Sequence, residues 1–178
     1  AVFRNVDAAA TVDPGEAPDP NERYIFGVDW GRDNDYTCIA VLASKTQRLV
    51  ALDRFNEIGW ALQRGRLVAL YEKWQPAAIW AEANSIGGPN IDALQAEGLP
   101  VSAFTTSAGS KPPLIESLAL AIERGELALL RDPVLLGELQ AYIVERLPSG
   151  RFRYTAPPGM HDDTVIAVAL AWHGATCQ

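Results

Sequence analysis

The sequence lacks several features that would place it in other protein classes. It has no apolar run near the roughly 20 residues of a membrane-spanning helix, and its first residues do not resemble a secretory signal peptide. No Gly-x-x-x-x-Gly-Lys-Ser/Thr phosphate loop occurs, so we expect no P-loop ATPase activity. The two cysteines, Cys38 and Cys177, have no metal-binding spacing, which favours a reduced, intracellular environment. An initiator methionine is also missing, and we therefore expect a piece of a larger protein.

Composition points to one ordinary globular domain with a net charge that needs closer inspection. Of the 178 residues, 48% are hydrophobic and 21% are charged. The net charge of −7 argues against a nucleic-acid-binding protein. However, residues 1–22 carry five acids and one arginine, so the remaining body is only slightly acidic. Acidity of this kind is compatible with a carboxylate metal site.

The pattern of residues divides the chain into two parts. Residues 5–22 are rich in Ala, Pro, Asp and Glu and lack apolar periodicity, which is typical of a linker. We therefore interpret residues 1–22 as a linker and residues 23–178 as a folded domain. Periodicity and turn residues in that domain predict strands at 24–30, 37–43, 49–55, 77–81 and 101–104, and helices at 59–74, 87–97, 111–124 and 162–173. They also predict a helix from 133 that gives way to a hairpin of strands 142–147 and 151–155.

This order of elements predicts a mixed α/β sheet. The first three strands follow each other closely and form an antiparallel unit, whereas the later strands alternate with helices and pair in parallel. Helices are expected on both faces of the sheet. Ligand sites in such sheets lie at the carboxyl ends of the parallel strands.

Four acids stand where such a site is expected. Asp29 ends the first strand, Glu82 follows the fourth, and Asp162 and Asp163 open the last helix. Acids at adjacent strand ends can reach one point, because neighbouring strands lie about 4.8 Å apart. Converging carboxylates repel one another unless a cation joins them, and hard oxygen ligands suit Mg²⁺ or Mn²⁺. Two such ions, about 3.5–4 Å apart, can support phosphodiester hydrolysis.

Each acid also has a simpler interpretation. An aspartate at a strand end is often a turn former, and an aspartate at a helix start is often an N-cap. Glu82 is hardest to explain in this way, because it follows a buried apolar strand directly. The combination of the acids, rather than any one of them, carries the hypothesis of a metal site.

Three segments in this order resemble the nuclease domain of tailed-phage large terminase subunits, which has a ribonuclease H-like fold. They are GVDWG, AEANSIGG and GMHDDTVIAVALA. The segment SKPPLIESLALAIERGEL resembles the lysine-led helix of that family, and AVFRNVDAA resembles the junction after its packaging ATPase. The resemblance covers about residues 23–175.

The resemblance implies a site, partners and a location. Asp29, Glu82 and Asp163 are then the catalytic acids and metal ligands, with Asp162 as a second candidate and Asp35 as a further one. The expected cofactors are two Mg²⁺ or Mn²⁺ ions. The substrate is double-stranded DNA, the partners are the terminase ATPase domain, the portal protein and the small terminase subunit, and the location is the host cytoplasm, with no membrane association.

Cations outside the acidic motifs are candidates for DNA contact. Arg146, Arg151 and Arg153 flank the turn of the last hairpin, and Lys111 begins a helix. An ordinary basic edge that protects a strand from aggregation, and a solvated lysine, are the alternatives. His161 could orient a carboxylate or a water molecule, or could be an exposed loop residue.

Two other functions fit the same sequence. A Holliday-junction resolvase or another ribonuclease H-like nuclease would use the same acids on a different substrate. A non-enzymatic docking module for the capsid or portal would not need clustered carboxylates. An actin-like ATPase is disfavoured, since no second glycine-rich phosphate loop is present.

Overall fold

A five-stranded mixed sheet forms the centre of the molecule in this computed structural model, which describes residues 1–31, 35–56, 59–84 and 87–177. The strand order is β4-β3-β2-β5-β6. The strands are β2 (Tyr24–Asp29), β3 (Tyr36–Ala43), β4 (Arg48–Asn56), β5 (Ala78–Glu82) and β6 (Val101–Phe104). β3 runs antiparallel to β2 and β4, while β5 and β6 run parallel to β2, which confirms the predicted mixed sheet.

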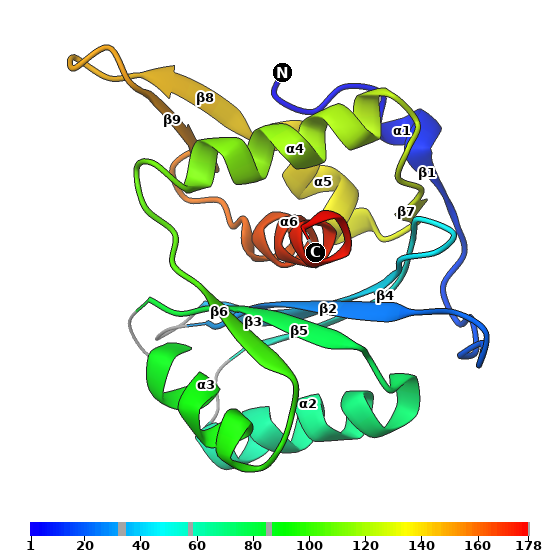
Figure 1. The fold of residues 1–178 in the computed structure, drawn as a ribbon. Coiled ribbons are helices and arrows are strands. Elements are labelled where there is room, and N and C mark those ends of the chain that lie inside the picture. Colours follow the sequence, from blue (N-terminus) through cyan, green and yellow to red (C-terminus); the bar gives the residue numbers. More distant parts are fainter. Residues whose placement is uncertain (32–34, 57–58, 85–86, 178) are drawn as a thin grey trace.

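Helices cover both faces of this sheet (Figure 1). On one face lie α2 (Trp60–Trp74) and α3 (Gly87–Ala96). On the other lie α4 (Lys111–Glu123), α5 (Pro133–Ala141) and α6 (Asp163–Thr176). The strands β8 (Ile143–Arg146) and β9 (Phe152–Thr155) form the predicted hairpin, which projects from the body at the upper left of Figure 1. No helix in the described part of the chain is long and apolar enough to cross a membrane.

Helix α6 is apolar around nearly its whole circumference, which suits its position between the sheet and α4. A β-carbon added to Gly27 of β2 would lie 1.9 Å from the carbonyl oxygen of Ala167 and 2.5 Å from the nitrogen of Ala171. A β-carbon at Gly174 would lie 2.8 Å from a methyl group of Ile25. The helix therefore runs antiparallel to β2 at very short range, and its N-terminus lies over the end of β2.

The prediction of an unstructured linker in residues 5–22 is wrong for its first part. Residues Val6–Ala9 form α1, and Ala10–Val12 form β1, which pairs in parallel with β7 (Leu129–Leu130). The side chains of Phe3, Val6 and Val12 are buried. Sparse apolar residues gave no periodic signal, because their partners lie more than 100 residues further along the chain. The link to a preceding ATPase domain stays a prediction.

Candidate active site

Two acidic strand ends lie side by side in the sheet. Val28 of β2 pairs with Ala81 of β5, so the next residues, Asp29 and Glu82, occupy neighbouring positions at the carboxyl ends of the two strands. Parallel strands are about 4.8 Å apart at such positions. The close packing of α6 on β2 adds the start of that helix to the same edge. Three segments far apart in the sequence therefore supply acids to one place.

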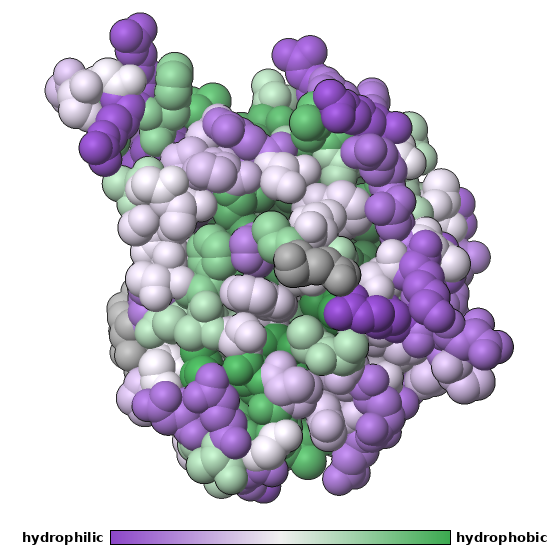
Figure 2. All heavy atoms as spheres, viewed as in Figure 1, coloured by the Kyte–Doolittle hydropathy of each residue, from purple (hydrophilic) through white to green (hydrophobic). Residues whose placement is uncertain are grey.

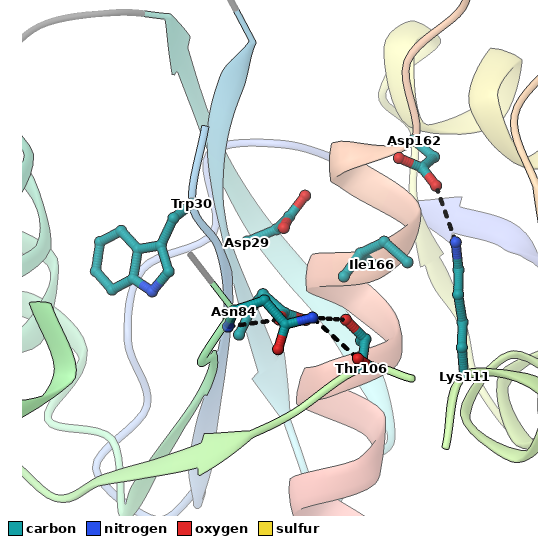
Figure 3. A pocket seen from close by; sticks show the side chains of 8 residues that line it. Asp29, Trp30, Asn84, Thr106, Lys111, Asp162 and Ile166 are labelled. Carbon is teal, nitrogen blue, oxygen red and sulfur yellow. Dashed lines mark hydrogen bonds and ion pairs between the residues drawn. The ribbon is translucent and has the colours of Figure 1, made fainter. Parts of the chain in front are cut away.

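A cavity of about 250 Å³ opens between these elements (Figure 3). Asp29 projects into it from the end of β2, while Asp162 and Ile166 contribute to its lining from the start of α6 (Figure 3). The lining is predominantly polar and includes three carboxylates, an amide, a hydroxyl and an ammonium group. It consists of Asp29, Trp30, Glu82, Asn84, Thr106, Lys111, Asp162 and Ile166.

Backbone and amide hydrogen bonds fix the Glu82 side of the cavity. The buried Glu82 carboxylate accepts a hydrogen bond of 2.8 Å from the backbone N–H of Asn84. The amide of Asn84 donates in turn to the carbonyl oxygen and the hydroxyl of Thr106, at 2.9 and 3.0 Å. A β-carbon at Gly87 would lie 2.0 Å from the Glu82 carbonyl oxygen, so α3 begins directly against this strand end. Glu82 is thus held in a preset orientation.

Asp162 is not the helix cap that its position suggests. It occupies the N-cap position of α6, but its side chain makes no capping hydrogen bond. Its carboxylate instead accepts a 3.3 Å hydrogen bond from the hydroxyl of Tyr142 and lies 3.8 Å from the ammonium group of Lys111. Lys111 reaches this carboxylate from the first turn of α4 (Figure 3). The carboxylate therefore stays available to the cavity.

Electrostatics in the cavity are dominated by unbalanced negative charge. Burial raises the pKa of the Asp29 carboxyl well above its usual range, and the charges of Asp162, Asp163 and Glu82 raise it further. Lys111 acts in the opposite direction, as the smallest of these effects. This upward shift of the Asp29 pKa is expected for a buried carboxyl group whose charged neighbours are mainly negative.

Asp163 lies beside the cavity rather than in its lining, within an ionic network. Its buried carboxylate accepts a 2.7 Å hydrogen bond from Nε of Arg54. The same guanidinium lies 3.7 Å from Glu138 and 3.5 Å above the ring of Tyr36. Glu138 also accepts hydrogen bonds from the backbone N–H and the hydroxyl of Thr164. Burial raises the pKa of the Glu138 carboxyl.

The structure thus brings together most of the acids that the sequence singled out. Asp29, Glu82 and Asp162 meet at the cavity with Lys111, and Asp163 lies next to it. Asp35 and His161 do not line the cavity; their side chains are exposed and lie 3.8 Å apart. The exposed arginines of the hairpin also lie outside it; they are Arg146, Arg151 and Arg153. Ser85 and Ile86 of the second motif fall outside the described residues.

The donor set fits a hard divalent cation. Within the described ranges, no three Asp, Glu, His or Cys side chains converge closely enough to form a preassembled metal cluster. Nevertheless, the charges of three other carboxylates raise the pKa of Asp29. Two of these acids already form ion pairs, Asp162 with Lys111 and Asp163 with Arg54. Oxygen-only ligands of this kind suit Mg²⁺ or Mn²⁺ better than softer metals.

Sequence reasoning missed Asn84, Thr106, Arg54 and Glu138. Asn84 could have been noticed, because it follows Glu82 by two residues in a turn. Arg54 carries a subtler signal: Asp29 pairs with Cys38, which pairs with Arg54, so all three project from the same face of the sheet. Finding it requires the strand register, which the sequence does not give.

Comparison with known proteins agrees with this geometry. The family model described as a terminase RNaseH-like domain matches residues 26–172. The large terminase subunits of Thermus virus P23-45 and Thermus phage G20c are 34% and 33% identical over 154 residues. This covers 86% of the chain and 32% of each relative, so the chain spans about a third of their length.

Solved structures show the same fold. The large terminase nuclease of the thermophilic phage G20c superposes with a TM-score of 0.87 at 31% identity, covering 96% of both chains. The same nuclease with bound magnesium also has a TM-score of 0.87, over 97% of this chain and 96% of that one. The large terminase nuclease domain of Thermus phage P74-26, at 31% identity, has a TM-score of 0.84 over 97% of this chain and 94% of that one. The chain therefore belongs to the family of terminase RNaseH-like domains, as its three acidic motifs predicted.

Proposed function

We propose that this chain is a metal-dependent endonuclease domain that cleaves double-stranded DNA during viral genome packaging in the host cytoplasm. The observation that carries the proposal is the cavity itself. Asp29, Glu82 and Asp162 line it, and Asp163 adds its charge from beside it. Structures of the G20c nuclease with bound magnesium, cobalt and zinc support a divalent ion at such a site.

In this proposal Asp29, Glu82 and Asp163 hold Mg²⁺ or Mn²⁺, with Asp162 as an additional ligand and two ions in total. A bound ion supplies Lewis acidity toward the phosphodiester. Asn84 keeps the Glu82 carboxylate oriented through its backbone N–H. Lys111 lies 3.8 Å from the Asp162 carboxylate, and its ammonium group can bind a DNA phosphate instead of that carboxylate when DNA enters.

The test is cleavage of supercoiled plasmid DNA by the purified chain, with Mg²⁺, with Mn²⁺ and with a chelator. We expect nicked and linear products only in the presence of a divalent ion. Cleavage that persists in the chelator, or no cleavage with either ion, would overturn the proposal. Branched and linear duplexes compared in the same assay separate this function from a Holliday-junction resolvase, which would cut only the branched substrate.

The two adjacent acids of α6 can be compared in the same assay. The family resemblance implies that Asp163→Asn reduces cleavage more than Asp162→Asn does. The structure adds a second expectation: Asp163→Asn should also lower the melting temperature without metal, because it weakens the ion pair with Arg54. Asp162→Asn should leave that temperature nearly unchanged, since its ion pair with Lys111 is partly exposed.

The hairpin arginines and Lys111 are proposed to track the DNA backbone. Each lost phosphate contact lowers the slope of log affinity against log salt by about 0.9. Arg151→Glu combined with Arg153→Glu should therefore flatten the slope by about 1.8 if each contacts one phosphate. Arg64→Glu with Arg124→Glu is a matched control, with the same charge change on α2 and at the end of α4. Equal slopes in the two double variants would exclude the hairpin as a DNA contact.

The ATPase domain, the portal protein and the small terminase subunit remain proposed partners, inferred from the kind of protein that the relatives are. A docking module without activity is the alternative. It predicts binding to a portal without any metal-dependent cleavage, so the plasmid assay decides between the two.

A further inference from the structure

A second cavity of about 310 Å³ adjoins the candidate active site. It lies between the β8–β9 hairpin and the start of α4. Thr106 and Lys111 line both cavities, so the two are neighbours along one surface. We call this second cavity the hairpin groove.

The lining of the hairpin groove differs in character from that of the acidic cavity. Its apolar wall includes Pro112, Leu147 and Phe152, and the Phe152 side chain is 55% exposed. Arg151 and Arg153 precede and follow Phe152 in the sequence and contribute to the lining, as does Lys111 from α4; no acid is among the described residues that line the groove. Figure 2 shows the hairpin as a protrusion at the upper left, where strongly hydrophilic and hydrophobic residues stand together.

The wall of this groove is anchored rather than loose. The hydroxyl of Tyr154 on β9 donates a 2.6 Å hydrogen bond to Glu116 on α4. β8 and β9 are paired from Ile143–Thr155 to Arg146–Phe152. An anchored wall loses less conformational entropy when a ligand binds.

Exposed aromatic surface beside several cations is the chemistry that binds a nucleotide. A base stacks on the aromatic ring, while cations that line the same groove attract the phosphates. The bases of an intact duplex are stacked and paired, so they cannot cover Phe152. An unpaired nucleotide can, and the shared residues Thr106 and Lys111 place that nucleotide next to the cleavage site.

We propose that the hairpin groove binds one unpaired nucleotide of the DNA strand next to the scissile phosphate, with its base stacked on Phe152. This inference rests on the proposed function and gives it a substrate preference: frayed or overhanging DNA over fully paired DNA. The positive lining excludes a basic partner, and the continuity with the acidic cavity favours DNA over a second copy of the chain.

The experiment measures binding in a chelating buffer, so that no cleavage occurs. The probes are a blunt duplex and the same duplex with a short single-stranded overhang that carries 2-aminopurine. The parent chain should bind the overhang at least about fivefold more tightly, because stacking of one base contributes about 1 kcal/mol or more. Stacking should also quench the 2-aminopurine fluorescence.

Variants of Phe152 test the stacking directly. Phe152→Ala and Phe152→Leu should abolish the quench and the preference for the overhang, whereas Phe152→Trp should keep both. Leu62→Ala is the control, since Leu62 is an equally exposed apolar side chain on the opposite face of the sheet. Full quenching by Phe152→Ala, or no preference in the parent, would overturn the inference.

Other outcomes are also decisive. If light scattering shows a dimer of the parent that Phe152→Ala dissolves, the hairpin groove is a self-association surface and the inference is wrong. If the parent cleaves plasmid DNA with Mn²⁺ but shows no preference for the overhang, only the hairpin groove assignment fails. If it does not cleave at all, the proposed function fails, whatever the binding result.

Discussion

The two adjacent aspartates at the N-terminus of α6 lie in opposite environments, one buried and one facing a cavity. Asp163 is buried against Arg54, whose guanidinium is held in place by Glu138 and by the ring of Tyr36. Asp162, one residue earlier, faces a cavity, and its counter-charge among the described residues is the long, partly exposed side chain of Lys111. We call the Asp163 side, which the guanidinium of Arg54 fills, the closed side. The Asp162 side, which faces the cavity, is the open side.

This difference separates an acid that has a buried counter-ion from acids that do not. A buried ion pair with several supporting contacts is costly to break, so it holds the helix in place. An open cluster of acids near one exposed lysine instead destabilises the charged form of its buried member, in line with the raised pKa of Asp29. We infer that the closed side positions α6, and Asp163 with it, while the open side is where a metal ion enters and leaves the site.

The largest expected effect lies on the open side. Glu82→Gln keeps the size of the side chain and an acceptor for the backbone N–H of Asn84, but removes the negative charge. Plasmid cleavage with Mn²⁺ should fall by more than about 100-fold, because even residues outside the ligand shell of a metal site contribute about 10–100-fold. Glu72→Gln, on an exposed position of α2, is the control. Cleavage within tenfold of the parent would show that Glu82 is not a ligand.

The next effect concerns the closed side. Arg54→Met leaves Asp163 and Glu138 without their shared cation, and such a loss costs about 3 kcal/mol in the free energy of unfolding. The melting temperature should fall by about 6–12 °C in a domain of this size. Arg64→Met, which removes an exposed ion pair with Glu97, should lower the stability far less, because solvent screens that pair. Similar losses in both variants, measured by chemical denaturation, would contradict the distinction between the two sides.

The smallest effect is the pH dependence of stability without metal. The folded chain keeps the proton on Asp29 to a higher pH than the unfolded chain does, so stability falls as the pH rises above the ordinary carboxyl pKa of about 4. Below that pKa the group is protonated in both states and contributes nothing. Since Asn cannot ionise, Asp29→Asn should melt higher than the parent near neutral pH.

The same difference should shrink as the pH is lowered toward about 4. Thermal melts of both proteins in a chelating buffer across this range measure it. A difference that does not change with pH would mean that the charge of Asp29 is not what destabilises the metal-free fold.

Local patterns predicted most of the fold and most of the acidic residues. The strand ends at Asp29 and Glu82 and the apolar helix after Asp163 are properties of short segments, so periodicity found them. The N-terminal segment was misinterpreted because Phe3 and Val12 are buried by elements more than 100 residues away. Contacts of that range leave no local pattern.

The roles of the two adjacent aspartates were also beyond the sequence. A turn of about 100° per residue predicts that Asp162 and Asp163 point in different directions, but not which one faces the cavity. Which of the two faces the cavity depends on Arg54, because Arg54 binds Asp163. The register of β2, β3 and β4 aligns Arg54 with Asp29. Without that register, Arg54 looks like an ordinary charged residue in an edge strand.

Calorimetric titration of Mn²⁺ into the parent and into Asp29→Asn tests the central claim most directly. Asp29 is the residue on which the charges of the other acids converge, so it should carry the ion if the cavity is a metal site. We predict saturable binding by the parent and an affinity at least about tenfold weaker for Asp29→Asn, which should remain folded. Equal affinity in the two proteins would contradict the account and place the metal elsewhere.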